Sequence, residues 1–157
     1  MKKIILPMII CVLIDRIIKI LCLSNLDIGD GIDIIDNVFS ITLVTNTGAA
    51  FSILSSSTVF LIILSLIVIG IIYFFFIKDQ NLSNFMQIIY GILLGGIIGN
   101  LLDRLIYGYV IDYLNFSIIN FPVFNFADIC IVTSIAIIII NLLKGDKNAV
   151  QSSKWFN

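Results

Sequence analysis

Histidine and glutamate are both absent from the 157-residue chain. Without histidine the protein has no imidazole for catalysis, which excludes Ser-His-Asp and Cys-His arrangements, and it lacks the commonest zinc ligand. Acid–base chemistry would therefore fall chiefly to aspartates, and we expect no metal and no other cofactor. Cysteine is scarce as well: Cys11, Cys22 and Cys130 show no C-x-x-C spacing and lie in apolar runs. We interpret these three as apolar packing residues.

Charged residues are also few. They make up 12% of the sequence, against 60% hydrophobic residues, and the mean hydropathy is +1.15. This composition is too apolar for a soluble domain and indicates a membrane protein, which we expect to form a single integral membrane domain over residues 1–157. The net charge of -1 provides no basic patch, so nucleic acid is not an expected partner.

Four segments have the length and apolar character of membrane-spanning helices, at about 20 residues each. They cover residues 4–23, 59–77, 85–107 and 124–143. The first follows two lysines and begins like a signal peptide, but charges interrupt it and no small-x-small cleavage site follows, so we expect a retained helix.

The cations predict the orientation of these helices. Residues 24–57 and 108–127 contain no Lys or Arg, whereas the remaining connections and the two ends carry Lys2, Lys3, Lys78, Lys144, Lys147 and Lys154. Because cytoplasmic segments are rich in cations, both termini should be cytoplasmic and both cation-free loops should face outward.

This topology gathers polar side chains near the outer membrane face. They are Asp15, Arg16 and Lys19 of the first helix, Asn100, Asp103 and Arg104 of the third, and Asp128 of the fourth. Snorkelling and mutual ion pairing, as between Asp15 and Lys19 or between Asp103 and an arginine, would account for some of them. Asp112 and Asp128 have no adjacent cation, and for these two a functional role is the better interpretation.

Two further patterns describe the helices and the outer loops. Gly91, Gly95 and Gly99 repeat every four residues and provide a ridge for close helix packing. In the first loop, residues 38–45 alternate as in a strand and Asn46-Thr47-Gly48 is typical of a turn. The second loop mixes aromatic and polar residues, as expected of a segment at the headgroup level. The predicted fold is an all-α membrane protein of four transmembrane helices, with a small extracytoplasmic β-cradle and an interfacial segment.

Four stretches occur in a characteristic order: DRIIK (15–19), NTGAAFS (46–52), GGIIGNLLDRLIYGYVIDYL (95–114) and FNFADICI (124–131). Together they make the chain resemble lipoprotein signal peptidase, the bacterial type II signal peptidase of the aspartyl membrane protease family, over nearly its whole length. The resemblance implies that the catalytic residues are Asp112 and Asp128. It also implies substrate-binding or supporting residues: Asp15, Lys19, Asn46, Gly48, Asn100, Asp103, Arg104, Asn125 and Ala127. Arg16, where the family more often has a neutral residue, and Tyr113, where Phe is common, are departures.

The resemblance further implies a substrate and a location. The substrate would be a prolipoprotein, cut just before its diacylglyceryl-modified cysteine, in the cytoplasmic (inner) membrane of a bacterium with the active site at the outer face. Membrane lipid would surround the protein, and the cyclic lipopeptide globomycin would inhibit it.

The chemistry of the residues agrees with this implication. Two neighbouring carboxylates do not ionise easily together and would share one proton, so that one activates water while the other polarises the scissile carbonyl. Asp128 begins the fourth helix, whose dipole favours an anion, and we expect it to be the resting base; its alternative is an ordinary helix N-cap. Asn46 and Arg104 would bind the substrate backbone or an anionic intermediate, and Asn100, Asp103 and Asn125 would orient the pair, whereas Asp15 and Lys19 would fix helix packing.

Other protein classes fit the sequence less well. A proton-coupled transporter or channel subunit would place its charges near the midplane and show an inverted repeat. An intramembrane protease of the presenilin or prepilin-peptidase type would carry a G-x-G-D element, and DIGDG at 27–31 is not one. A purely structural membrane protein would explain the glycines but not Asp112 and Asp128.

Overall fold

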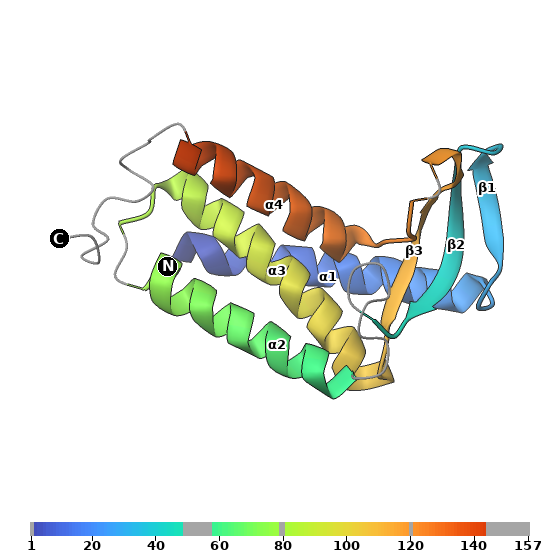
Figure 1. Cartoon of the computed structure of the whole chain (residues 1–157), viewed down its shortest axis with the longest axis horizontal. Coiled ribbons are helices and arrows are strands. Elements are labelled where there is room, and N and C mark those ends of the chain that lie inside the picture. Colours follow the sequence, from blue (N-terminus) through green and yellow to red (C-terminus); the bar gives the residue numbers. More distant parts are fainter. Residues whose placement is uncertain (1, 49–57, 79–80, 120, 144–157) are drawn as a thin grey trace.

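Four long helical segments lie alongside one another in the computed structural model, which describes residues 2–48, 58–78, 81–119 and 121–143 (Figure 1). They are α1 (Lys2–Asn25), α2 (Thr58–Ile71) with its π-helical continuation η2 (Ile72–Ile77), α3 (Asn84–Tyr107) and α4 (Phe126–Leu143). A small sheet stands at one end of this bundle (Figure 1). The protein is therefore helix-rich with a minor β element, as the sequence predicts.

Three of the helices are long and apolar enough to cross a membrane. These are Thr58–Ile77, Asn84–Tyr107 and Phe126–Leu143. Helix α1 has sufficient length, with 24 residues, but it contains Asp15, Arg16 and Lys19 in its second half. Composition thus identifies three candidate spans within the described residues, and the predicted count of four is not confirmed.

Helix α3 occupies the centre of the bundle, with α1 packed on one side and α4 on another. Its glycines permit this close approach. A Cβ atom added at Gly95 would lie 2.9 Å from the Met8 carbonyl oxygen of α1, and one added at Gly96 would lie 2.5 Å from the Ala127 carbonyl oxygen of α4. Gly95 of the ridge and its neighbour Gly96 therefore bring two helices, α1 and α4, against α3.

The sheet is antiparallel and has the order β1-β2-β3. Its strands are β1 (Gly31–Ile35), β2 (Phe39–Asn46) and β3 (Val110–Phe116). The strand predicted for residues 38–45 is confirmed as β2. Within the segment predicted to lie at the headgroup level, residues 110–116 form a further strand, β3, which pairs with β2; the headgroup location stays a prediction.

Strand β3 lacks the alternation that makes a half-exposed strand recognisable. Its first four residues, from Val110 to Tyr113, are all buried. It begins immediately after α3, because Gly108 adopts a left-handed conformation with φ of 81° and reverses the chain. The strand is thereby brought back over the end of the helix that precedes it.

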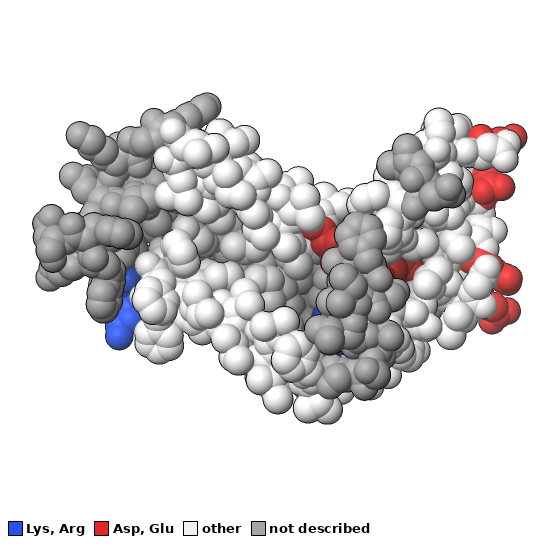
Figure 2. Space-filling model, in the orientation of Figure 1, with Lys and Arg blue, Asp and Glu red and all other residues white. Residues whose placement is uncertain are grey.

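Apolar contacts fix the sheet to the bundle. Leu43 of β2 and two residues of β3, Ile111 and Tyr113, form a buried cluster with Cys22 near the end of α1. Four exposed aspartates lie on β1 or in the turns next to it: Asp27, Asp30, Asp33 and Asp36. Figure 2 shows acidic side chains gathered at the sheet end of the molecule and a hollow between the sheet and the helices.

Candidate active site

The first turn of α4 is held by side chains from other parts of the chain. Its first three backbone N–H groups have no partner within the helix, as at any helix start. Each donates instead to a side-chain oxygen: Phe126 to the hydroxyl of Tyr113 (3.1 Å), Ala127 to Oδ1 of Asp15 (3.2 Å) and Asp128 to Oδ1 of Asn125 (3.0 Å). Helix α4 is thus joined at its start to β3 and to α1.

Asp128 is the third residue of this helix and not its N-cap. Asn125 precedes the helix, and its Oδ1 accepts from the Asp128 backbone N–H while Asp128 Oδ2 accepts from the Asn125 backbone N–H (3.2 Å). These reciprocal bonds form a capping box, with aspartate where glutamate or glutamine is usual. The N-cap alternative is therefore wrong. The other carboxylate oxygen, Oδ1, accepts from Nδ2 of Asn100 at 2.7 Å.

Asp112 lies on β3 with its side chain 2% exposed. Its Oδ1 accepts from Nδ2 of Asn125 at 2.6 Å, and its Oδ2 accepts from Nδ2 of Asn46 at 2.9 Å. Burial, followed by the negative charge of Asp128, raises the pKa of Asp112 to about 6, although the hydrogen bonds from the Asn46 and Asn125 side chains lower it. The Asp112 carboxyl group therefore stays protonated to a higher pH than an ordinary aspartate.

Asn125 connects the two carboxyl groups. It is fully buried, and its amide group also donates to Oδ1 of Asn100 and to the carbonyl oxygen of Ile111. One side chain therefore caps α4, contacts the strand that carries Asp112 and contacts the helix that positions Asp128. In the part of the chain that the structure describes, neither Asp112 nor Asp128 forms an ion pair with Lys or Arg.

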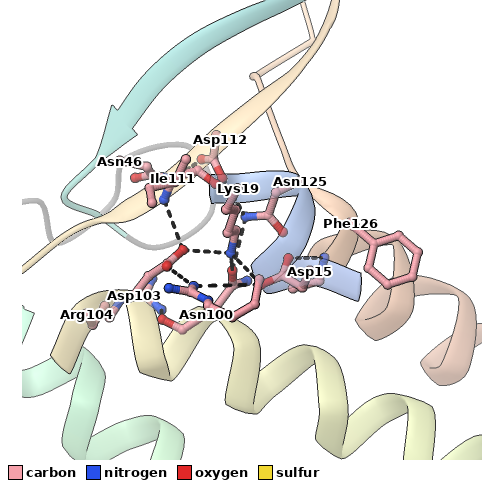
Figure 3. Close-up of polar contacts among 12 residues, drawn as sticks. Asp15, Lys19, Asn46, Asn100, Asp103, Arg104, Ile111, Asp112, Asn125 and Phe126 are labelled. Atoms are coloured by element: carbon pink, nitrogen blue, oxygen red, sulfur yellow. Dashed lines mark hydrogen bonds and ion pairs between the residues drawn. The ribbon is translucent and has the colours of Figure 1, made fainter. Parts of the chain in front are cut away.

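A buried group of ion pairs lies beside the two carboxyl groups of the candidate site (Figure 3). Lys19 Nζ is 2.9 Å from Asp15 Oδ2 and 2.6 Å from Asp103 Oδ2, and it donates to Oδ1 of Asn100 at 3.2 Å. Arg16 Nη2 binds the other oxygen of Asp103. The predicted pairing of Asp103 with an arginine is made by Arg16.

The ion-pair group is connected to the strand of Asp112. Oδ2 of Asp103 accepts from the backbone N–H of Ile111 at 3.1 Å. Asp15 and Lys19, for which a helix-packing role was predicted, make contacts between helices: Asp15 of α1 binds the start of α4, and Lys19 of α1 binds Asn100 of α3.

The residues expected to face a substrate have partners within the protein. Asn46 uses its amide on Asp112 and its carbonyl oxygen on the Gly48 backbone N–H (3.0 Å). Arg104 Nη2 donates to the Gly48 carbonyl oxygen at 3.1 Å. The remainder of the NTGAAFS stretch, residues 49–52, lies outside the described residues.

Both carboxyl groups line a cavity of about 560 Å³. Its polar wall contains Asn46, Asn100, Arg104, Asp112 and Asp128, and its apolar wall contains Val110, Phe121, Pro122, Val123, Phe124, Ile129, Ile131 and Val132. A largely apolar cavity of this size with a few convergent polar groups is typical of a ligand site. The pair therefore faces a space that an apolar chain could occupy.

The sequence predicted that most of these polar residues lie near one another, but it did not predict some of their contacts. The Tyr113 hydroxyl and the Ile111 backbone have no sequence signal of their own. The wall at 121–124 was assigned to a segment at the headgroup level, although its aromatic content could have indicated a binding surface. Within the described residues, no group of three or more His, Cys, Asp or Glu is arranged to hold a metal ion.

Apolar helices that support a largely apolar cavity with two carboxyl groups in its wall are typical of a membrane-embedded enzyme. The family described as Signal peptidase (SPase) II matches residues 7–144. Lipoprotein signal peptidase of Halothermothrix orenii is 37% identical over 138 residues, which cover 88% of this chain and 93% of that one, and that of Staphylococcus aureus is 36% identical over 139 residues, covering 87% and 85%.

Solved structures agree with the sequence comparison. Two structures of bacterial membrane enzymes, each 35% identical, superpose with TM-scores of 0.86 and 0.82; the first covers 94% of this chain and 92% of its own, and the second covers 92% and 94%. The chain belongs to the signal peptidase II family. It is accordingly a protease and an integral membrane protein, and the transporter alternative has no support.

Proposed function

We propose that the protein is an aspartic-type endopeptidase that removes signal peptides from prolipoproteins by cutting before the diacylglyceryl-modified cysteine. One observation carries the aspartic assignment. Asp112 and Asp128, from separate elements, are joined through the single side chain of Asn125 at the wall of a largely apolar cavity. The substrate class is supported by the relatives, which are named lipoprotein signal peptidases.

The two carboxyl groups would divide the chemistry of peptide hydrolysis between them. Asp128 is the base, because the positive end of the α4 dipole and the surrounding N–H groups favour its anion. It removes a proton from water, whose oxygen attacks the scissile carbonyl carbon. Asp112, protonated at the start, donates to the carbonyl oxygen as the tetrahedral intermediate forms. Collapse of the intermediate breaks the C–N bond as the proton held by Asp128 passes to the leaving amine, and one hydroxyl proton of the intermediate returns to Asp112 as the carboxylic acid forms.

The remaining polar residues would keep this pair in position. Asn46, Asn100 and Asn125 bind the carboxyl oxygens directly, and Asp103 holds the strand of Asp112 through Ile111. Asp15 holds the helix of Asp128 through Ala127, and Lys19 balances Asp15. Arg104 lines the cavity and is held by its bond to the Gly48 carbonyl oxygen, and it would stabilise an anionic intermediate.

We further propose that α1 is a fourth membrane span and that the sheet lies on the outer face of the bacterial inner membrane, with both termini cytoplasmic. The distribution of charge supports this orientation, because the sheet end carries four exposed aspartates while exposed Lys3 and Lys78 belong to the other connections. The active site would then meet the end of a signal helix at the outer boundary, where membrane lipid surrounds the protein.

Thiol labelling tests the orientation. In a background with the three native cysteines replaced, Ser117→Cys should react with an impermeant thiol reagent in intact cells, whereas Asn81→Cys should react only after permeabilisation. Both positions are exposed, so accessibility is matched. Labelling of Asn81→Cys in intact cells would place the sheet on the cytoplasmic side.

The pH–rate profile of cleavage should be bell-shaped. It should fall at acid pH as the base member of the pair is protonated. It should fall again as the pH rises above about 6 and the raised pKa of Asp112 is passed, because the proton needed on the carbonyl oxygen is then lost. The measurement is kcat/KM against pH with a lipidated precursor peptide. A rate that rises steadily through pH 9 would contradict the shared-proton assignment.

The cavity also supports an inhibitor prediction that belongs to the same proposal. Globomycin, a cyclic lipopeptide, should compete with the precursor for the cavity beside the two carboxyl groups.

Cleavage of a lipidated precursor, with the unmodified peptide as the control, would test the substrate class directly. Equal cleavage of both peptides would remove the lipid requirement.

A further inference from the structure

Arg16 has no part in the proposed chemistry, yet it belongs to the group of charged side chains beside the pair. Its side chain is 18% exposed, and its Nη2 binds Oδ1 of Asp103 and lies 4.0 Å from Oδ2 of Asp15. Its guanidinium carbon lies 6.0 Å from the centre of the Tyr107 ring, which itself stacks against the ring of Tyr109. The arginine is therefore held at the edge of the buried group and not free in solvent.

The charges of the site cancel only when Arg16 is counted. The carboxyl groups are Asp15, Asp103, Asp112 and Asp128, and the cations are Arg16, Lys19 and Arg104. With one proton on the Asp112–Asp128 pair, three anions face three cations. Without Arg16, one negative charge would be left over in surroundings that screen it poorly.

Arg16 reaches the pair through a short series of contacts. It binds Asp103, and Asp103 accepts from the backbone N–H of Ile111, the residue before Asp112. The other groups that face Asp112 are Lys19 of α1, Arg104 of α3, Asp128 of α4 and the amides of Asn46 and Asn125. Lys19 is already shared between Asp15 and Asp103, so it cannot replace the missing cation.

We propose that Arg16 is a positioning residue that balances the charge of this site and so sets the pH range in which the Asp112–Asp128 pair holds a single proton. The inference rests on the proposed function. Arg16 acts through its charge and not through a bidentate geometry, because the same nitrogen, Nη2, faces both carboxylates. A lysine at this position should therefore serve.

The pH profile of cleavage tests the inference. Arg16→Gln removes a cation and should move both limbs of the profile toward higher pH by about half a pH unit or more, which is about a threefold loss of rate on the acid limb. Arg16→Lys keeps the positive charge and should keep the wild-type profile. Lys78→Gln makes the same change in net charge at an exposed position after η2, and it should leave both limbs in place.

Asp103→Asn supplies a second measurement that does not depend on the folding of the Arg16→Gln variant. It removes an anion and should move both limbs toward lower pH, and the double variant should return them to the wild-type positions. Limbs that superpose on wild type in Arg16→Gln or in Asp103→Asn would overturn the inference, as would a uniform loss of rate at every pH. A wild-type protein that does not cleave the precursor would overturn the proposed function instead.

Discussion

Asp112→Asn and Asp128→Asn should each reduce cleavage of a lipidated precursor by about 10²–10⁴-fold, the range of a general acid or base, so that product falls to background. An asparagine retains the size of the side chain and its hydrogen bonds to neighbouring amides in part, but it cannot exchange a proton. Both variants should therefore insert into the membrane and purify as wild type does. The measurement is product formation under single-turnover conditions, with the yield and the melting temperature of each variant recorded.

Asp33→Asn is the matched control for this pair. Asp33 is an exposed carboxylate of β1, a strand that does not line the cavity, and its replacement makes the same change in charge. It should leave the rate unchanged. Retention of more than a tenth of wild-type activity in either Asp112→Asn or Asp128→Asn would remove that residue from the catalytic pair.

Asn125→Ala should have the largest effect of any substitution outside the pair. It removes the N-cap of α4, at about 0.5–2 kcal/mol, and leaves a carboxyl oxygen of Asp112 without its donor, at about 1–3 kcal/mol. It also removes the Oδ1 that accepts from the Asp128 backbone N–H, which loosens the position of Asp128, and a displacement of about 1 Å can cost about 10²-fold in rate. We expect loss of both thermal stability and kcat, with a smaller change in KM.

Asn115→Ala separates this effect from the general loss of a half-buried side-chain amide on the same strand. Asn115 lies on the same strand as Asp112, and its amide donates to the hydroxyl of Ser40 at 3.1 Å. Its replacement should cost about 1 kcal/mol and leave kcat within about twofold of wild type. If Asn125→Ala behaves like Asn115→Ala, the connecting role assigned to Asn125 is wrong.

The sequence predicted the helices because long apolar runs are a strong and local signal. It also predicted β2, whose residues alternate, and the placement of polar side chains near one end of the bundle. It did not predict β3, because Val110, Ile111, Asp112 and Tyr113 are all buried and the strand shows no alternation. Its position depends on pairing with β2, which lies more than 60 residues away in the chain.

The geometry of the site was predictable in kind but not in detail. The absence of histidine and glutamate left aspartates as the groups for acid–base chemistry, and two of them line the cavity. The connecting role of Asn125 was not predictable, because a single amide that serves three elements is defined only after β3, α3 and α4 have come together. The role of Asp15 at the start of α4 depends on the same assembly.

The measurement that tests the aspartic mechanism most directly is cleavage of a lipidated precursor peptide by the purified protein in the presence of EDTA and a thiol-blocking reagent. The three cysteines are buried and the chain has no histidine, so the carboxyl pair should carry the reaction without help from a thiol or a metal. The account predicts an unchanged rate and a single product, cut just before the modified cysteine, by mass spectrometry. Loss of activity with EDTA, restored by adding a divalent metal ion, would contradict it.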